Sequence, residues 1–410
     1  MSLNSTPRSS RTHIALFGKT NAGKSSFINA ITNQNLAIVS DVKGTTTDPV
    51  YKSIEILPIG PCVLIDTAGL DDESTLGNLR KEKTLEVLNK SDIALVLIDS
   101  NIGISDYDYF IIDQIKSKKI PYVVIFNKSD LKDLNEDYIK KLEKDLGTKI
   151  YKTSAIKSIG INSIKKQISN LLPCDEDKFK IVGDLVNPSD FVVLVTPIDK
   201  AAPKGRLILP QQQVIRDILE SDAISIVTKE YELRETINNL GKKPKLVITD
   251  SQAFLKVDAD TPKDILMTSF SILFARFKGD LVELINGAKK IKDLKDKDKV
   301  LICEGCTHHR QSDDIGTVKI PRWIRQITGK EIIFEHSSGG GFPDNLKDYS
   351  LIVHCGACML NQKSMLYRIE QAKENNIPIV NYGILIAYVH GILDRALEPF
   401  PLAKLIWEEE

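Results

Sequence analysis

Residues 12–32 read THIALFGKTNAGKSSFINAIT, an apolar run that leads through a glycine-rich segment into an apolar pattern of helical spacing. Residues 18–25 match the P-loop pattern G-x-x-x-x-G-K-[ST], placed as that pattern requires between a strand and a helix. The glycines let successive backbone N–H groups point at phosphates beside the positive end of the helix. We expect Lys24 to neutralise phosphate charge and the Ser25 hydroxyl to bind Mg²⁺. The alternative interpretation is a glycine-rich structural turn.

Two further segments add metal and phosphate contacts. Asp-Thr-Ala-Gly at 66–69 closes an apolar run, so Asp66 is expected at the carboxyl edge of a sheet, holding Mg²⁺ through water. The Gly69 N–H is expected to meet the γ-phosphate. Between the two motifs, the loop Gly-Thr-Thr-Thr-Asp at 44–48 offers a hydroxyl to the metal, and its position favours Thr46.

A guanine-specific motif follows the apolar run at 122–126. Residues 127–130 read Asn-Lys-Ser-Asp. A carboxylate at Asp130 can accept hydrogen bonds from N1–H and the exocyclic amine of guanine, which adenine does not present, so this residue selects GTP over ATP. Thr-Ser-Ala at 153–155 is expected to give backbone contacts to the guanine oxygen. Together and in this order, the motifs predict a Mg²⁺-dependent GTPase.

The residues expected to bind GTP are Asn21, Ala22, Gly23, Lys24, Ser25, Ser26, Thr46, Asp66, Gly69, Asn127, Lys128, Asp130, Ser154 and Ala155. Those expected at Mg²⁺ are Ser25, Thr46 and Asp66. Leu70 stands where Ras-like enzymes place the glutamine that orients water, so hydrolysis must use another group. Asp71, Asp72 and Glu73 lie close by in sequence, and no catalytic base is assigned.

Composition excludes several classes of protein. The 55 Lys and Arg offset 55 Asp and Glu, and this zero net charge argues against a nucleic acid as the main partner. The longest apolar stretches, such as 93–98, are far shorter than the ~20 residues that cross a membrane. No signal peptide is readable in residues 1–12. We therefore expect a cytoplasmic protein without membrane contact.

Strand-sized apolar runs alternate with helical segments along the chain, which predicts parallel sheets covered by helices. The 410 residues exceed one ordinary core. Pro173 and the polar stretch 174–180 suggest a first linker. The expected strands are 12–18, 63–66, 93–99, 122–127 and 149–153, then 191–196, 223–228 and 246–249, then 300–303, 331–334, 351–354 and 377–381.

Four of the six cysteines form two pairs, Cys303/Cys306 and Cys355/Cys358, each directly after an expected strand. Two parallel strands of one sheet would bring the pairs together at the edge where α/β folds place ligands. Clustered thiolates select zinc or an iron–sulfur cluster. A closed tetrahedral zinc site is the natural alternative. Against it, the flanking His308, His309 and His354 are not needed by a closed Cys₄ site.

Residues 11–172 resemble the translation-factor-like branch of small GTPases that includes Era and the tRNA-modifying MnmE. In the MnmE-like group an asparagine at the position of Asn21 helps bind a potassium ion that acts where an arginine finger would. The resemblance thus implies K⁺ at Asn21 and potassium-stimulated hydrolysis. A plain turn residue is the alternative.

The whole chain resembles the [FeFe]-hydrogenase maturation GTPase family, HydF, whose signature is C-x-H followed, after a spacer, by H-C-x-x-C. Here the signature reads Cys306-Thr307-His308 and His354-Cys355-Gly356-Ala357-Cys358. The resemblance implies that Cys306, Cys355 and Cys358 hold a [4Fe–4S] cluster. The fourth ligand stays open among His308, His354, Glu304 and Cys303.

The resemblance implies an α/β fold of three domains: a P-loop GTPase with a mostly parallel sheet, an α/β dimerisation domain, and a Rossmann-like α/β iron–sulfur cluster domain. The expected ranges are a disordered tail at 1–11, then 12–173, 180–262 and 263–410. It also implies a homodimeric scaffold and carrier that assembles a transient diiron cluster and delivers it to apo-[FeFe]-hydrogenase. Two radical-SAM maturases are the further implied partners.

Two other functions remain from the residues themselves. One is an Era-like ribosome-assembly or RNA-modifying GTPase with a structural zinc site, which the zero net charge disfavours. The other is a redox-regulated GTPase whose cysteine pairs form disulfides.

Overall fold

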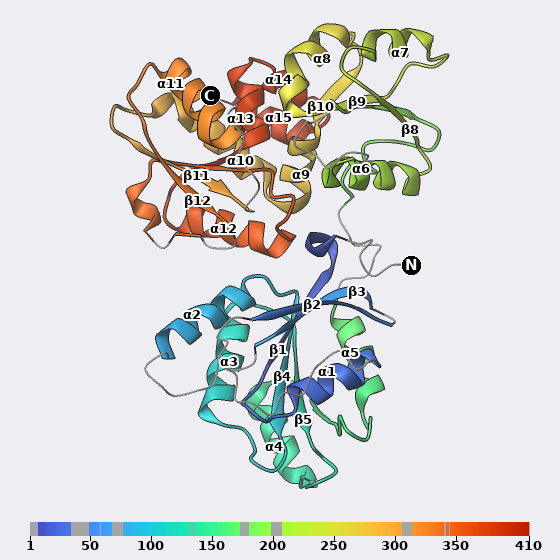
Figure 1. The fold of residues 1–410 in the computed structure, drawn as a ribbon, viewed down its shortest axis with the longest axis vertical. Coiled ribbons are helices and arrows are strands. Elements are labelled where there is room, and N and C mark those ends of the chain that lie inside the picture. The colour runs from blue at the N-terminus through green and yellow to red at the C-terminus, as the bar shows by residue number, and fades with distance from the viewer. Residues whose placement is uncertain are drawn as a thin grey trace. The chain divides into compact units, whose positions relative to one another are not determined.

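The structure is a computed structural model that describes residues 7–33, 49–57, 59–67, 77–132, 134–172, 180–197, 207–305, 314–339, 342–343 and 345–409. The chain divides into two compact units, Met1–Lys178 and Phe179–Glu410, here the N-terminal and the C-terminal unit. Figure 1 labels most of their helices and strands. Of the tail predicted at 1–11, residues 1–6 lie outside the described ranges, Arg8–Ser10 form a short 3₁₀-helix and Arg11 is buried.

A six-stranded sheet forms the centre of the N-terminal unit, in the order β2-β3-β1-β4-β5-β6 (Figure 1). β2 is antiparallel to β3, and the other pairs are parallel. The strands are β1 (Thr12–Phe17), β2 (Val50–Ile56), β3 (Gly60–Asp66), β4 (Ile93–Asp99), β5 (Tyr122–Asn127) and β6 (Ile150–Lys152). The predicted α/β class with a mostly parallel sheet is confirmed.

Two hydrophobic cores lie on opposite faces of this sheet. Side chains alternate between the faces along each strand, so Ile14 and Leu16 belong to one core and Ala15 and Phe17 to the other. The first core is covered by α1 (Lys24–Thr32) and α5 (Ile161–Leu171). The second is covered by α2 (Gly77–Leu88), α3 (Asp106–Ser117) and α4 (Glu136–Leu146).

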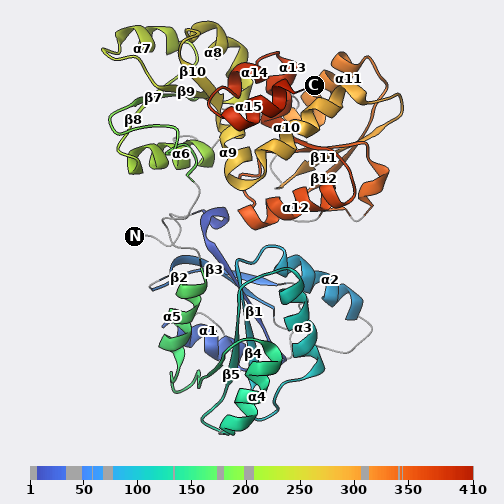
Figure 2. The ribbon, with the colours of Figure 1, turned by 180° about the vertical axis from the view of Figure 1, so that it is seen from behind.

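The middle sheet, the first in the C-terminal unit, has the order β10-β9-β7-β8 and is parallel throughout (Figure 2). Its strands are β7 (Phe191–Val195), β8 (Ile224–Thr228), β9 (Leu246–Thr249) and β10 (Leu266–Ser269). Its helices are α6 (Leu209–Glu220), α7 (Leu233–Asn239), α8 (Phe254–Asp260) and α9 (Phe270–Lys278). Since β10 lies beyond residue 262, this sheet extends past the predicted domain boundary.

The last sheet, in the order β12-β11-β13-β14, is also fully parallel. Its strands are β11 (Lys299–Glu304), β12 (Ile333–Ser338), β13 (Leu351–His354) and β14 (Ile379–Asn381). The helices are α10 (Leu281–Lys289), α11 (Ile320–Thr328), α12 (Gln362–Glu374), α13 (Tyr382–Val389), α14 (Leu393–Ala396) and α15 (Pro401–Glu408).

One continuous hydrophobic core joins the two sheets of the C-terminal unit, with members from Ile181 to Ala403. Helix α9 contacts α6 of the middle sheet as well as α12 and α13 of the last sheet. Arg395, which is buried, donates to the carbonyl oxygens of Thr261 and Pro262. The two sheets are therefore fixed against each other by apolar packing and by buried polar contacts.

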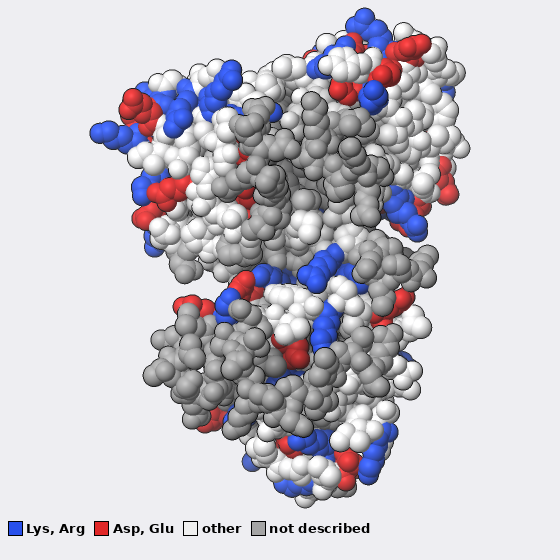
Figure 3. Space-filling model, viewed as in Figure 1, with Lys and Arg blue, Asp and Glu red and all other residues white. Residues whose placement is uncertain are grey.

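Charged side chains of both signs are interspersed over the described surface seen in Figure 3, in keeping with the zero net charge. Among the described helices, none is long and apolar enough to cross a membrane.

Gly287 provides a test of the packing in the C-terminal unit. A Cβ at this position of α10 would lie 1.9 Å from the carbonyl oxygen of Ile379 on β14, so the helix could no longer approach the strand as closely. We expect Gly287→Ala to lower the free energy of unfolding by about 1–3 kcal/mol, the usual effect of overpacking. Both tryptophans, Trp323 and Trp407, belong to this unit, so their fluorescence during denaturation reports on it alone.

Gly241→Ala is the matched control, because a Cβ there meets nothing within 4 Å. Equal denaturation midpoints for Gly287→Ala and Gly241→Ala would contradict the packing described for α10.

Candidate functional site

The P-loop connects β1 to α1 and owes its path to two glycines. Gly18 has φ +151°, and a Cβ there would lie 2.3 Å from the Leu97 carbonyl oxygen on β4. Gly23 has φ +87°, and a Cβ there would lie 2.4 Å from Asn127 Nδ2. Because both positions lack room for a side chain, the loop can follow this course only with glycine.

Lys24 begins α1 and turns back over the loop. It is buried, and its Nζ donates to the carbonyl oxygens of Gly18 at 2.5 Å and Lys19 at 2.9 Å. Ser25 and Ser26 follow in the first helical turn and are partly exposed. Asn21, in the middle of the loop, is exposed and has φ +66°. The structure thus brings the predicted lysine, hydroxyls and N-terminal helix N–H groups together in one short segment.

Asp66 lies beside the start of this loop. It is the last residue of β3 and pairs in register with Leu16 of β1. The next residue, Thr67, donates to the Leu16 carbonyl oxygen from its backbone N (3.3 Å) and its Oγ1 (2.7 Å). The buried carboxylate of Asp66 is thereby held at the sheet edge where the P-loop begins. Thr46 and Gly69 lie outside the described residues.

Asn127 connects two loops through its side-chain amide. Its Nδ2 donates to the Ala22 carbonyl oxygen at 3.0 Å, and its Oδ1 accepts from the backbone N of Ala155 at 3.0 Å. The Thr153 hydroxyl also donates to Oδ1, at 3.3 Å. Asn127 was predicted to bind GTP; its contacts here are internal, and they position the P-loop against residues 153–155.

The predicted guanine-specific residues follow β5. Lys128 has φ +62°, and its Nζ lies 2.7 Å from Asp99 Oδ2. A hydrogen bond from the Ser154 side chain holds the pKa of Asp130 below its ordinary value, assisted by the charge of Lys157. Asp130 is therefore an anion at neutral pH, as an acceptor for guanine must be. Sequence reasoning assigned no role to Asp99, although it ends an apolar strand at the same edge.

Asp130→Asn tests guanine recognition. The amide of the variant can place an N–H donor opposite the N1–H donor of guanine, so that no hydrogen bond forms between them. We expect this loss to lower GTP affinity by about 10²-fold or more. Xanthosine triphosphate carries a carbonyl group in place of the exocyclic amine of guanine. In titrations with the two nucleotides, we expect Asp130→Asn to bind xanthosine triphosphate more tightly than GTP. Asp137→Asn, an exposed carboxylate in the first turn of α4, is the control. Unchanged GTP affinity in Asp130→Asn would rule out this role.

The second candidate site forms where β11 and β13 end side by side. These parallel strands place Cys303 opposite His354, and the Cys355 N–H donates to the Cys303 carbonyl oxygen at 2.8 Å. The Gly305 N–H donates to Cys355 Sγ at 3.1 Å. The expectation that the two cysteine segments meet at one sheet edge is confirmed for the described residues. Cys306 and His308 lie outside them.

The described thiols differ in their surroundings. Cys355 and Cys358 are partly exposed, whereas Cys303 is 1% exposed and packs in the hydrophobic core. Burial raises the pKa of Cys303 to about 12, so without a metal it is a neutral thiol. The described residues, which omit Cys306, contain no group of three or more His, Cys, Asp or Glu arranged for a metal.

His354 is fully buried and uses both ring nitrogens. Arg368 Nη1 lies 2.7 Å from Nε2, and the Cys355 carbonyl oxygen lies 2.8 Å from Nδ1. Because a guanidinium only donates, Nε2 accepts and Nδ1 carries the proton. Burial, together with the charge of Arg368, lowers the pKa of His354 to about 3. His354 is neutral and could ligate a metal only after losing its contact with Arg368.

Arg368 and Glu304 complete the surroundings of this edge. Arg368 also donates from Nη2 to the Gly339 carbonyl oxygen at 2.9 Å, which ties the end of β12 to β13. Glu304 is buried, and the Tyr382 hydroxyl lies 3.4 Å from its Oε1. Of the candidates for a fourth ligand, His354 and Glu304 are thus engaged in internal contacts. Arg368, on α12, lies outside every recognisable motif, so no sequence signal indicated its role.

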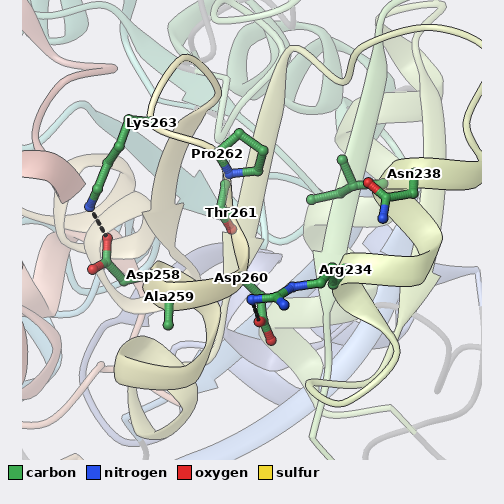
Figure 4. A pocket seen from close by; sticks show the side chains of 9 residues that line it. Arg234, Asn238, Asp258, Ala259, Asp260, Thr261, Pro262 and Lys263 are labelled. Carbon is green, nitrogen blue, oxygen red and sulfur yellow. Dashed lines mark hydrogen bonds and ion pairs between the residues drawn. The ribbon is translucent and has the colours of Figure 1, made fainter.

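A cavity of about 470 Å³ lies between α7 and α8 (Figure 4). Its charged side chains pair with one another: Arg234 Nη2 lies 3.0 Å from Asp260 Oδ1, and Lys263 Nζ lies 3.2 Å from Asp258 Oδ1. These pairs account for the charges that line the cavity, and we assign it no ligand.

Three family models match separate parts of the chain. Residues 13–128 match a 50S ribosome-binding GTPase, residues 181–279 the hydrogen maturase F dimerization domain, and residues 282–399 the hydrogen maturase F tetramerization domain. The dimerization match extends beyond residue 262, in agreement with the position of β10 in the middle sheet. The model that matches residues 282–399 is described as a tetramerization domain, whereas the sequence predicted an iron–sulfur cluster domain at 263–410.

Individual relatives match part of the chain. The tRNA modification GTPase MnmE of Desulforamulus reducens is 36% identical over 158 residues, 38% of this chain and 34% of the relative. MnmE of a Thermoanaerobacter species is 38% identical over 160 residues, again 38% and 34%. The chain thus spans about a third of the length of these relatives. An Era variant of Aquifex aeolicus, bound to GDP and AlF₄⁻, is 21% identical and covers 56% of this chain and 98% of its own, with a TM-score of 0.36.

Proposed function

We propose, on the premise that this chain belongs to the hydrogen maturase F family, that it is a GTP-hydrolysing scaffold that assembles a diiron precursor and delivers it to apo-[FeFe]-hydrogenase. The observation that carries this proposal is the pairing of β11 with β13, which brings the two cysteine segments to one sheet edge. The same chain holds a GTPase domain. Through its two assembly domains the chain forms homodimers and larger oligomers.

The donor set at this edge suits a [4Fe–4S] cluster. Cys355 and Cys358 lie on the loop after β13, and Gly305, which donates to Cys355 Sγ, directly precedes Cys306 in sequence. N–H groups that donate to a cysteine sulfur are among the contacts that tune such clusters. We propose that Cys306, Cys355 and Cys358 hold the cluster and that the fourth position exchanges ligands.

That exchangeable position supplies the chemistry a carrier needs. A cluster held by these cysteines would supply one open iron position for the diiron fragment, which is cargo. His354 supports the cysteine loop without binding the cluster. Arg368 fixes the imidazole ring, and the Nδ1–H group donates to the Cys355 carbonyl oxygen. For that reason we do not propose His354 as the fourth ligand. Cys303, His308 and Glu304 remain as candidates.

GTP binding follows from the N-terminal unit. Lys24 neutralises the β- and γ-phosphates, Ser25, Thr46 and Asp66 hold Mg²⁺, and Asp130 selects guanine. Lys24 then exchanges the carbonyl oxygens of Gly18 and Lys19 for phosphate oxygens. Asn127 keeps the P-loop in place through Ala22. Asn21, exposed at the centre of the loop, binds K⁺ beside the phosphates.

An RNA-modifying GTPase with a structural zinc is the second candidate, and the likeness of the N-terminal part to MnmE favours it. Zero net charge counts against it. The two candidates differ in the metal that the cysteines hold.

Metal content separates these candidates. After anaerobic reconstitution we expect near-stoichiometric iron and sulfide and a [4Fe–4S] EPR signal on reduction. Cys355→Ser and Cys358→Ser are expected to lose most of the iron, because each removes a thiolate ligand. Cys62→Ser is the control, since this buried cysteine lies on β3 of the N-terminal unit. Zinc that stays bound in place of iron in a fully active protein would exclude the scaffold.

The potassium site has its own test. We expect GTP turnover to be about tenfold or more faster in KCl than in NaCl. This is a modest part of the ~10³–10⁵-fold increase in kcat that an arginine finger supplies. Asn21→Ala is expected to abolish the difference between the salts, while Asn101→Ala, an exposed asparagine after β4, keeps it. Equal wild-type rates in the two salts would contradict a role for K⁺ in hydrolysis.

A further inference from the structure

Lys278 is a buried cation next to the cysteine loop. It is the last residue of α9 and is 2% exposed. Its Nζ donates to the carbonyl oxygens of Ala357 (3.0 Å), Cys358 (3.1 Å) and Leu360 (2.8 Å). An ammonium has three N–H donors, so these contacts use all of them on one short segment, residues 357–360.

This arrangement exceeds what a lysine at a helix end ordinarily does. Such a lysine binds the last carbonyl groups of its own helix, whereas Lys278 binds groups about 80 residues later in the chain. It also holds a strained backbone, because Ala357, between the two cysteines, has φ +52°. Lys278 therefore fixes the conformation of the loop that carries Cys355 and Cys358.

Among the described residues, no carboxylate pairs with Lys278; the neighbouring groups that become anionic when they bind a metal are the thiols of Cys358 and Cys355. The aromatic ring of Phe274, 5.5 Å from Nζ, adds only a weak attraction. A buried ammonium is costly unless an anion is close, so the loop is built for an anionic occupant.

We propose that Lys278 is the fixed counter-charge of the cluster, positioning the cysteine loop and raising the reduction potential of the bound iron–sulfur group. The inference rests on the proposed function. Reduction adds one negative charge, and a cation held in a poorly solvated site stabilises the reduced state more than the oxidised one. Lys278 touches loop carbonyl groups rather than cargo, so it is a positioning residue.

The test is an EPR-monitored redox titration of the full-length, anaerobically reconstituted protein. Lys278→Gln removes the charge but keeps an N–H donor, and Lys278→Arg keeps the charge. We expect Lys278→Gln to make reduction about tenfold less favourable, a midpoint lower by about 59 mV for one electron, and Lys278→Arg to stay near the wild type. Lys363→Gln, an exposed lysine on α12, is the matched control and should not change the midpoint.

An unchanged midpoint in Lys278→Gln, or an equal fall in Lys278→Arg, would overturn the inference, because only the loop geometry would then matter. If Lys278→Gln cannot hold the cluster, iron content decides: retention in Lys278→Arg supports the counter-charge, and equal loss in both overturns it. A wild-type protein that binds no iron–sulfur cluster would instead overturn the proposed function itself.

Discussion

Hydrogen bonding between parallel strands is the constraint on which both sites depend. In the N-terminal unit it places Asp66 beside Leu16, where the P-loop begins. In the C-terminal unit it places His354 beside Cys303, so that Gly305 reaches Cys355 across 50 residues of sequence. Each pairing aligns the carboxyl ends of two strands and so gathers polar groups on a rigid edge. A shift in either register would separate the members of that site.

Buried polar side chains then fix the loops that the strands bring together. Asn127 ties the P-loop to residues 153–155, and Arg368 ties His354 to the end of β12. Lys278 does the same for the cysteine loop with three backbone contacts. In each case one side chain forms hydrogen bonds with groups that are distant in sequence, which stabilises one loop conformation. Both candidate sites therefore have buried polar side chains that hold their loops in place.

Sequence predicted the strands that are buried on both faces, because their apolar runs are continuous. It missed β2, an edge strand with several half-exposed side chains, and β10, whose four residues include only two apolar ones, Leu266 and Met267. The motif residues Lys24, Asp66 and Cys355 were found because their spacing carries chemistry. Lys278 and Arg368 were not, because a buried lysine or arginine on an amphipathic helix resembles any exposed one until tertiary contacts are known.

One chain holds both the GTP site and the cysteine edge that we propose for the cluster, and transfer of the cargo tests their joint role most directly. The chain is loaded anaerobically by the two maturases, separated from them, and mixed with apo-[FeFe]-hydrogenase while hydrogen evolution is followed. We expect hydrogenase activity from the loaded wild type and almost none from loaded Cys358→Ser. Activity that arises equally with the variant, or none with the wild type, would contradict it.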